Sequence, residues 1–488
     1  MKNLRLLSIS AVTCALVFTT GLSAAAGDLD TTFDADGIVR TDFAGGSSDR
    51  AYSVAVQADG RIVAAGDVDS ADGGGSFALA RYKVTGALDP TFDGDGKVRT
   101  RFAPTSSELG TAGALQPDGK IVMAGAVGIP GSGTAADFAL ARYNADGALD
   151  TAFDGDGKVI TDFASQTDYA VAIAVQPDRK ILAAGWSRPP SEIPFDVAVA
   201  RYNPDGSLDT SFSADGRVTT AIAPGSEDFA QTVAVQPDGK IIVGGGSGNA
   251  GIVIRYLSDG SLDASFDGDG IVMTHGLITD VAVQTDGKTV AVSDSSGFSV
   301  RRLNADGSID TSFGEGGMAT APLESASAYS LAVEPDGNIV AAGSMAPGDF
   351  AVARFRPNGN LDETFGSDGT IVTDLGGPAD FSYSVALAPG GKIVLGGISG
   401  PEDQTTWDFA VARYVGALPP CKVPNVRGKK LGVARARIRK ARCTVSKVTR
   451  KPSKQMKKGR VLSQSPRAGT ILPSGGKVKL VVGKGRRR

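Results

Sequence analysis

The chain is poor in the residues that most enzymes use for catalysis. Its 488 residues include one histidine, three cysteines and two tryptophans. The sequence contains no phosphate-binding glycine loop and no set of histidines and cysteines spaced as metal ligands, so little remains for acid–base or nucleophilic chemistry. Carboxylates are plentiful, which leaves a glycan-acting hydrolase or lyase as an alternative. We therefore expect a protein that is not an enzyme and that has no cofactor.

Long apolar runs are also absent, except at the N-terminus. Lys2 and Arg5 precede a mostly apolar stretch over residues 6–20, and Ala24-Ala25-Ala26 offers a small-residue cleavage site. This pattern predicts a secretory signal peptide over residues 1–26. Serine and threonine interrupt the stretch, which is too short for a typical membrane span, although a retained anchor is the alternative. We expect a secreted, extracellular protein that has no membrane span after cleavage.

Cysteine is nearly absent from the mature chain. Cys14 lies inside the predicted signal peptide, in a context that matches a lipoprotein cysteine poorly, so only Cys421 and Cys443 remain after cleavage. In an exported protein, two cysteines in one small domain are expected to form a disulfide. Closing a loop of this size would stabilise the fold by about 3 kcal/mol. Two buried thiols are the alternative.

Acidic residues are missing from the C-terminal part of the chain. Residues 421–488 hold 23 lysines and arginines and no aspartate or glutamate, which leaves 27 basic and 53 acidic residues in 1–420. Such asymmetry indicates two modules with different partners. The C-terminal part also lacks aromatic residues that could stack on bases, so specific nucleic-acid binding is not expected.

Seven copies of one phrase, Gly-x-Leu/Ile-Asp-x-x-Phe, run through the rest of the chain. Their final phenylalanines lie 59, 61, 59, 54, 47 and 52 residues apart, and they are Phe33, Phe92, Phe153, Phe212, Phe266, Phe313 and Phe365. A period near 50–60 residues indicates a ring or an array of similar units.

Each unit contains four strand-like runs. Between Gly157 and Phe212 these runs are GKVITDF, YAVAIAVQ, KILAAG and VAVARY, and a Pro-Asp-Gly type of turn joins the middle two. The aspartate of the repeated phrase is expected to cap a turn through its carboxylate, and the phenylalanine to pack between units. Seven units of four antiparallel strands predict an all-β fold with a seven-bladed β-propeller over residues 27–418.

The phase of the repeat predicts how the ring closes. The last unit ends after Tyr414 without its Asp-x-x-Phe, whereas a lone copy stands at residues 27–33. We expect residues 27–33 to complete the last unit beside residues 409–418. An open solenoid is the alternative, but it would need atypical capping units at both ends.

The repeated phrases also carry a family resemblance. FALARYNADGALDTAFDGDGKV and AVQPDGKIVMAG, with their counterparts in all seven units of residues 27–414, resemble the delta-60 repeat of bacterial β-propellers. That family has no settled biochemical role. The resemblance therefore implies the fold and leaves the ligand open.

Comparison among the units separates two faces of the ring. The Pro-Asp-Gly turns and the Leu-Asp-x-x-Phe phrases share a nearly uniform face, which we interpret as structural. The loops of the opposite, variable face differ in length and composition, and rigid scaffolds commonly carry function on such loops. Trp186 and Trp407 lie there, and they are the candidate ligand-binding residues for a glycan or a protein. Packing of each tryptophan over its own loop is the alternative.

Three units contain Asp-Gly-Asp-Gly, at residues 93–96, 154–157 and 267–270. Clustered carboxylate and carbonyl oxygens suit Ca²⁺. Other units replace the first aspartate, and the pattern lacks the length and the closing glutamate of an EF-hand loop. Turn chemistry is therefore the favoured interpretation, with a Ca²⁺ site as the alternative.

A separate α+β domain is predicted over residues 421–485, after a Pro419-Pro420 hinge and before a basic tail at 486–488. Residues 429–443 show helical spacing of apolar residues, and three strand-like runs follow. The phrases VPNVRGK, VLSQSPRAGTILPSGGKV and LVVGKG resemble the PASTA domain of bacterial penicillin-binding proteins and serine/threonine kinases. This resemblance implies binding of peptidoglycan or its fragments.

Together these features predict a cell-wall-associated envelope protein whose propeller is displayed by the PASTA-like module. The charge of residues 421–488 predicts attraction to any anionic cell-wall polymer, weakening as salt rises. The propeller would bind an unidentified protein or glycan. A surface adhesin or lectin is the alternative, and another is a basic module that folds against its own acidic propeller.

Overall fold

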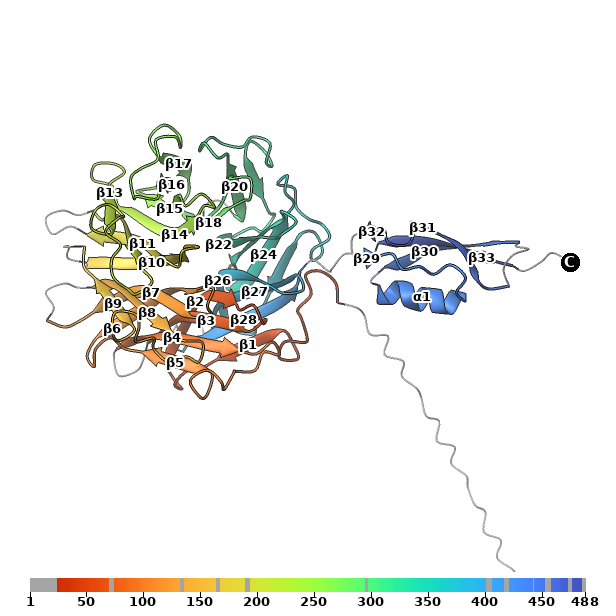
Figure 1. The fold of residues 1–488 in the computed structure, drawn as a ribbon, viewed down its shortest axis with the longest axis horizontal. Coiled ribbons are helices and arrows are strands. Elements are labelled where there is room, and N and C mark those ends of the chain that lie inside the picture. Colours follow the sequence, from red (N-terminus) through yellow and green to blue (C-terminus); the bar gives the residue numbers. More distant parts are fainter. Residues whose placement is uncertain are drawn as a thin grey trace, which may run out of the picture.

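The computed structural model confirms an all-β propeller with a small α+β domain (Figure 1). The predicted hinge, the basic tail and nearly all of the predicted signal peptide lie outside the described residues. No helix in the described part of the chain is long and apolar enough to cross a membrane. The structure describes residues 24–69, 74–131, 136–163, 167–188, 194–294, 297–400, 406–416, 421–441, 443–452, 458–472 and 476–484.

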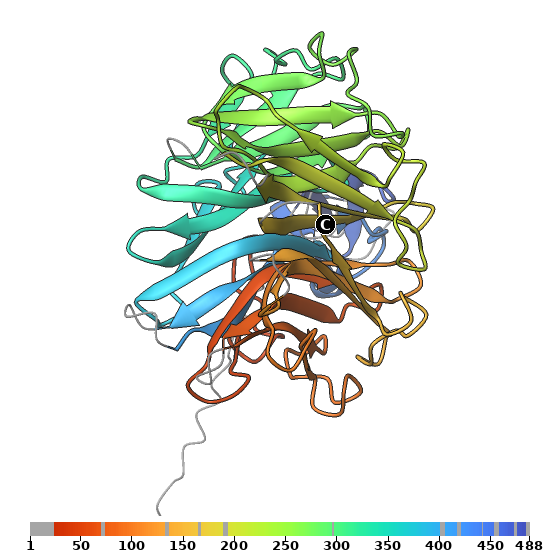
Figure 2. The ribbon, with the colours of Figure 1, turned by 90° about the vertical axis from the view of Figure 1, so that its left-hand side faces the viewer.

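Seven four-stranded antiparallel sheets, the blades, form a ring around a central axis (Figure 2). Within each blade the chain runs from the innermost strand outward. The first four blades are β2–β5 (Ser48–Val56, Ile62–Asp69, Gly75–Tyr82, Lys97–Thr100), β6–β9 (Ser107–Leu115, Ile121–Gly128, Asp137–Tyr143, Lys158–Thr161), β10–β13 (Thr167–Val175, Ile181–Arg188, Asp196–Tyr202, Arg217–Thr220) and β14–β17 (Asp228–Val235, Ile241–Ser247, Ala250–Tyr256, Ile271–His275). The others are β18–β21 (Ile278–Val283, Thr289–Ser293, Ser299–Leu303, Met318–Thr320), β22–β25 (Ala326–Val333, Ile339–Met345, Asp349–Phe355, Thr370–Thr373) and β26–β28 (Ala379–Ala388, Lys392–Gly400, Asp408–Val415) with β1 (Ile38–Thr41).

The two ends of the propeller meet in the seventh blade. Strand β1 pairs with β28, with Ile38 opposite Ala412. Upstream of β1, Leu29 bridges to Tyr414, and the Asp30 amide donates to the carbonyl of Arg413 at 2.8 Å. Residues 27–33 therefore lie beside the last strand as predicted, and β1 adds the outermost strand that this blade would otherwise lack.

The blade boundary differs by one strand from the sequence unit. The run GKVITDF stands first in the unit, but its strand β9 pairs with β8 as the outermost strand of the preceding blade. Sequence periodicity fixes the length of a repeat but not the point where one sheet ends, because that depends on which neighbouring strands share hydrogen bonds.

A buried ion-pair network holds the uniform face. Asp150 of the repeated phrase accepts Arg142 Nε at 2.7 Å and Lys120 Nζ at 2.6 Å, and its second oxygen accepts the amide of Ala152. The Arg142 guanidinium lies 4.5 Å from the Phe153 ring centroid. The same arginine–aspartate pair recurs in the other blades as Arg81–Asp89, Arg201–Asp209, Arg255–Asp263, Arg302–Asp310, Arg354–Asp362 and Arg413–Asp30. The predicted capping role of the aspartate is confirmed, whereas the buried arginine partner was not predicted.

The arginines also join neighbouring blades. Arg142 Nη1 donates to the carbonyl of Pro204 in the next blade, and Arg413 Nη1 donates to the carbonyl of Val84 at 2.7 Å. Burial of a charge is tolerated only when hydrogen bonds satisfy it. The repeated arginines and aspartates of the uniform face therefore make structural contacts, and the variable face is the better candidate for a binding site.

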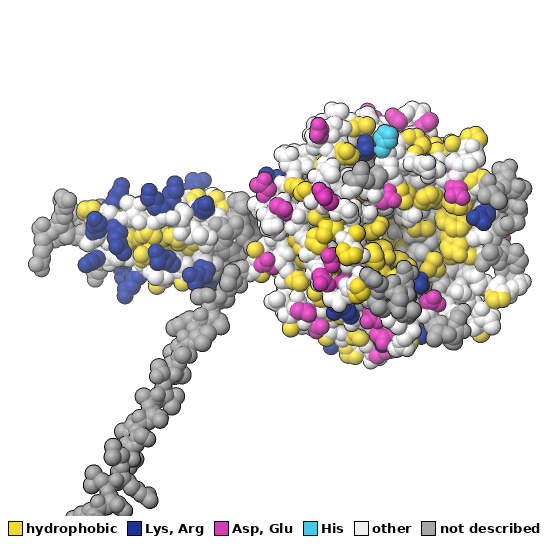
Figure 3. Space-filling view, turned by 180° about the vertical axis from the view of Figure 1, so that it is seen from behind, with side chains coloured by type: hydrophobic (Ala, Val, Ile, Leu, Met, Phe, Trp, Pro, Cys, Tyr) yellow, Lys and Arg dark blue, Asp and Glu magenta, His cyan; other side chains and the backbone are white. Residues whose placement is uncertain are grey.

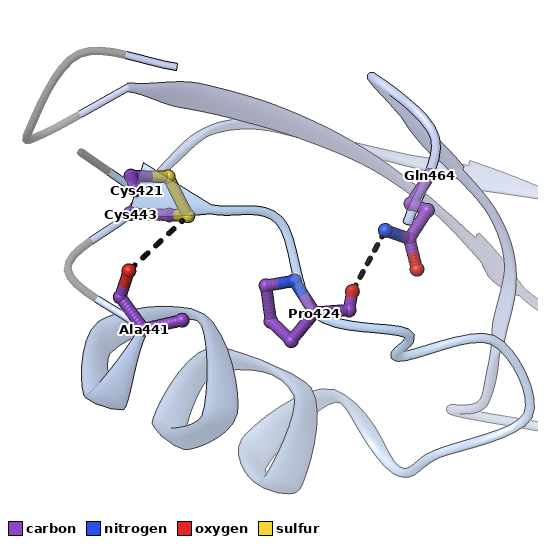
Figure 4. The surroundings of a disulfide bond; sticks show 5 residues. All are labelled: Cys421, Pro424, Ala441, Cys443 and Gln464. Carbon is purple, nitrogen blue, oxygen red and sulfur yellow. Dashed lines mark hydrogen bonds between the residues drawn. A yellow bond between two sulfur atoms is a disulfide. The ribbon is translucent and has the colours of Figure 1, made fainter. Parts of the chain in front are cut away.

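The small domain packs one helix, α1 (Leu431–Lys440), on a mixed sheet. Ala434 and Ile438 are the buried residues of the helix. The sheet contains β30 (Thr444–Lys451), β33 (Lys477–Gly483) and β31 (Val461–Ser465), and a two-stranded ribbon pairs β29 (Cys421–Lys422) with β32 (Ile471–Leu472). The predicted disulfide is present between Cys421 and Cys443, with a Cα–Cα distance of 5.2 Å (Figure 4). Figure 4 also shows Gln464, whose Nε2 donates to the carbonyl of Pro424 at 2.9 Å.

Candidate functional site

Trp186 packs partly over its own loop, because its ring centroid lies 4.8 Å from that of Phe195 at the end of that loop, but both predicted tryptophans also contact residues elsewhere. Trp186 lies on β11 and stacks on Tyr169 of β10, with ring centroids 4.7 Å apart and an interplanar angle of 17°. Trp407 precedes β28, and the Arg50 guanidinium of the first blade lies 5.8 Å from its ring centroid. Tyr169 and Arg50 line the same hollow on the variable face. Neither tryptophan is among the residues that line this hollow, but each contacts one residue that does.

The hollow has a volume of about 350 Å³ and is built by the first three blades. Its polar and aromatic lining consists of Arg50 from β2, Asp67 and Asp69 from β3, Glu108 from β6 and Tyr169 from β10. The remaining lining residues, all small except one leucine, are Gly75, Ser107, Leu109, Ala126, Gly128 and Ala136. A concave site with few polar groups and one aromatic wall is a typical ligand-binding environment.

Charged groups in the hollow are incompletely paired. Arg50 Nη1 lies 3.2 Å from Asp67 Oδ2, and Arg50 Nη2 lies 3.7 Å from Asp69 Oδ2. Asp67 Oδ1, Glu108 Oε2 and Arg50 Nε are buried and have no hydrogen-bond partner among the described residues. Buried polar atoms are nearly always paired in folded proteins. Two free acceptors and one free donor therefore suit a ligand with hydroxyl groups.

Burial raises the pKa of Asp67 to about 7, and the nearby carboxylates of Asp69 and Asp49 add to this effect, which Arg50 opposes. Burial also raises the pKa of Glu108, against the hydrogen bonds from Ser106 and the Phe102 amide. The hollow can therefore take up a proton near neutral pH, which is a property common at functional sites.

This protonation predicts how stability depends on pH. Because the folded pKa of Asp67 is above its ordinary value of 3.8, the folded chain binds the proton more tightly, and the free energy of unfolding falls as pH rises from about 4 to about 7. Asp67→Asn should remove this slope and stabilise the propeller at pH 8 by on the order of 2 kcal/mol. Thermal melts between pH 4 and pH 8 measure the effect, with Asp59→Asn as an exposed control. A variant with the wild-type pH profile would contradict the assignment.

An aromatic strip adjoins the hollow. The rings of Tyr52 and Tyr383 lie 5.3 Å apart, and those of Tyr383 and Tyr329 lie 5.8 Å apart. These tyrosines come from the innermost strands of three consecutive blades, β2, β26 and β22. Arg50 and Asp67 both act on the pKa of the Tyr52 hydroxyl, which burial raises. Sequence reasoning missed this strip, although three tyrosines among the seven equivalent positions were a usable signal.

The Asp-Gly-Asp-Gly turns show local turn chemistry. In each, the second aspartate accepts the amide two residues further on: Asp95 from Lys97 at 2.8 Å, Asp156 from Lys158 at 2.9 Å and Asp269 from Ile271 at 2.9 Å. In the described part of the chain, no aspartate of these turns belongs to a group of three acidic residues close enough to share a metal ion. Ca²⁺ at these turns stays the untested alternative.

Family models match both parts of the chain. A domain of unknown function, the DUF5122 β-propeller, matches residues 57–92, 116–153, 176–212, 236–266, 284–313 and 334–365, and the PASTA domain matches residues 422–484. The chain is a DUF5122 β-propeller followed by a PASTA domain. No curated protein matches the chain.

Three solved structures are similar to parts of the chain. A protein of unknown function from Bacteroides caccae is 11% identical over 61% of this chain and 94% of its own, with a TM-score of 0.38. The polysaccharide lyase Uly1 is 11% identical over 75% of this chain and 90% of its own, with a TM-score of 0.45. The three-PASTA-domain of a Ser/Thr kinase from Staphylococcus aureus is 25% identical over 13% of this chain and 32% of its own, with a TM-score of 0.13.

The PASTA domain presents a basic surface. Figure 3 shows lysine and arginine side chains spread over this domain, whereas acidic side chains are scattered over the propeller. On α1, Arg435, Arg437, Arg439 and Lys440 are exposed around the two buried residues. Because the domain contains no aspartate or glutamate, none of these charges is neutralised within it. A surface of this kind attracts anionic polymers.

Proposed function

We propose that this protein is an exported, non-enzymatic envelope-binding protein whose PASTA domain holds the propeller at the cell wall. The observation that carries the proposal is a PASTA domain with an uncompensated basic surface, joined to an acidic propeller. PASTA domains are linked to binding of peptidoglycan or other cell-wall components. The disulfide fits an oxidising, extracellular environment.

A sedimentation experiment tests the wall anchor. Residues 27–488 and a truncated chain that ends at Leu418 are mixed with isolated cell walls at low and high salt. We expect only the longer chain to pellet, and to keep pelleting at high salt, because a specific site does not depend on charge alone. If binding disappears at high salt, the domain binds only through its positive charge, as it would to any anionic wall polymer, and the specific wall anchor is contradicted.

A second candidate function is glycan binding by the variable face of the propeller. It is favoured by the contacts of Trp186 and Trp407 with two residues that line one polar hollow, and by the aromatic wall at Tyr169. Aromatic faces stack on sugar rings, and the free acceptors of the hollow suit hydroxyl groups. In the same experiment, pelleting of the truncated chain would support this function, and its loss in a Trp407→Ala variant would place the glycan at the hollow.

A further inference from the structure

Three aspartates meet where the ring closes. Asp42 follows β1, Asp408 begins β28, and Asp49 lies on β2. One carboxylate oxygen from each lies within 4.8 Å of the other two. The cluster therefore joins the N-terminal strand of the propeller, its last strand and its first blade.

Buried oxygens at this cluster lack partners. Asp49 is fully buried; its Oδ2 accepts the amide of Phe43 at 2.6 Å, but its Oδ1 has no hydrogen-bond partner among the described residues. Ser47 is only 4% exposed, and its hydroxyl approaches the Asp49 carboxylate closely enough to lower the pKa of that group, but Ser47 Oγ makes no well-formed hydrogen bond in the described structure. Asp49 Oδ1 and Ser47 Oγ thus lack well-formed hydrogen bonds, which normally costs stability when such atoms are buried.

The nearby cations compensate the carboxylates only in part. Burial raises the pKa of Asp49 and of Asp408, and neighbouring carboxylates raise both further. The positive charge of Arg99 lowers the pKa of Asp49, and that of Arg40 lowers the pKa of Asp408. The Arg40 side chain donates through Nε to Ser399 Oγ at 3.1 Å. An additional positive charge would fit the centre of the cluster.

The same arrangement recurs at other blade junctions. Equivalent clusters are Asp137, Asp162 and Asp168 between the second and third blades, and Asp349, Asp374 and Asp380 between the sixth and seventh. Asp380 is also fully buried, and burial raises its pKa against the hydrogen bonds from Ser399 and the backbone that lower it.

The junction between the first and second blades provides a contrast. Its equivalent positions are Ser76, Arg101 and Glu108. There Arg101 lowers the pKa of Glu108 against the effect of burial. At this junction a cation therefore stands at the position that Asp42 occupies in the cluster of three aspartates.

We propose that Asp42, Asp49 and Asp408 bind a divalent cation, with Ca²⁺ as the ion that suits them best, and that this ion ties the two ends of the propeller together. Ca²⁺ takes six to eight oxygen ligands at 2.3–2.6 Å in flexible geometry. Three carboxylates so close to one another can all contact one such ion, Ser47 Oγ offers a further ligand, and water completes the shell. Extracellular sites of this kind bind with dissociation constants on the order of 10⁻⁴ to 10⁻³ M.

Terbium luminescence tests this site directly, because Tb³⁺ substitutes for Ca²⁺ and is sensitised by a nearby tryptophan. Trp407 adjoins Asp408 in the sequence, and a Trp186→Phe background leaves it as the only tryptophan of the chain. Chelator-treated residues 27–488 should show saturable Tb³⁺ luminescence that Ca²⁺ displaces. Addition of 10 mM Ca²⁺ should also raise Tm by roughly 3 °C.

Asp42→Asn is the informative variant. Asp42 Oδ1 accepts the amides of Ala44 and Gly45, and asparagine retains that acceptor, so the loop keeps its hydrogen bonds while the ligand charge is lost. We expect at least a tenfold weaker apparent Tb³⁺ affinity, and the same from Asp408→Asn, while Asp93→Asn in an Asp-Gly-Asp-Gly turn changes nothing. Wild-type luminescence in both cluster variants, or no displacement by Ca²⁺, would overturn the proposal.

Discussion

Replacing Arg413 with alanine is expected to lower the free energy of unfolding of the propeller by about 3 kcal/mol. Arg413 is 2% exposed; its Nε donates to Asp30 at 2.8 Å, and its Nη1 donates to the carbonyl of Val84. Alanine would leave the Asp30 carboxylate buried with one cation fewer and the carbonyl without its donor. Lys392 still forms an ion pair with Asp30. The expected loss of unfolding free energy is therefore at the lower end of the range for breaking a buried ion pair.

Urea denaturation of residues 27–418 measures this loss. Asp59→Ala is the matched control, because Asp59 forms an exposed pair with Arg61 at 3.0 Å, and exposed pairs contribute less than about 1 kcal/mol. If Arg413→Ala costs no more than the control, the buried pair does not fasten the ring. A change in the slope with urea would indicate instead that the seventh blade opens separately.

The second large effect concerns the disulfide of the PASTA domain. A Cys421→Ser, Cys443→Ser chain should lose about 3 kcal/mol in that domain, since the bond closes a loop with a sequence separation of 22. The domain is small and its core consists of ten buried residues, so this loss is comparable with its whole stability. We expect the double variant to unfold the PASTA domain at moderate temperature while the propeller melts as before.

Calorimetry of residues 27–488 separates the two transitions. Reduction of the wild-type chain should reproduce the behaviour of the double variant, because Cys421 and Cys443 are the only cysteines in residues 27–488. Equal PASTA-domain melting with and without the disulfide would show that the hydrophobic core alone holds this domain. A fall in the propeller transition would instead reveal stabilising contact between the domains.

Most of the fold could be predicted from the sequence because the repeated phrase occurs seven times. A lone copy of the phrase at Gly27 to Phe33, together with a last unit that stops after Tyr414, was sufficient to predict that the ring closes. The spacing of Ala434 and Ile438 predicted the helix. The partners of the repeated aspartate were harder to see. Arg142 stands eight residues before Asp150 and Lys120 thirty residues before it, and such contacts depend on how strands fold back within the blade.

The candidate site could be predicted only in part. Trp186 and Trp407 stood out because they are the two tryptophans and were expected in variable loops, although Trp186 lies on β11. Arg50, Asp67 and Glu108 come from three strands of two blades, and a sequence read one repeat at a time does not bring them together. The clusters of three aspartates are hidden for the same reason, because each spans a junction between blades.

The fastening of the ring also constrains when the protein can finish folding. Asp30 and Arg413 are 383 residues apart, and joining the ends of a chain segment this long costs about 5 kcal/mol in loop entropy. Contacts at such separation form late, because intervening elements must already be in place. A chain that leaves the membrane from its N-terminus would keep β1 unpaired until the seventh blade has emerged. If the chain is exported as proposed, the ring would stay open until residue 415 has crossed the membrane, shortly before the PASTA domain follows, so that an export interrupted before that point would leave an open ring.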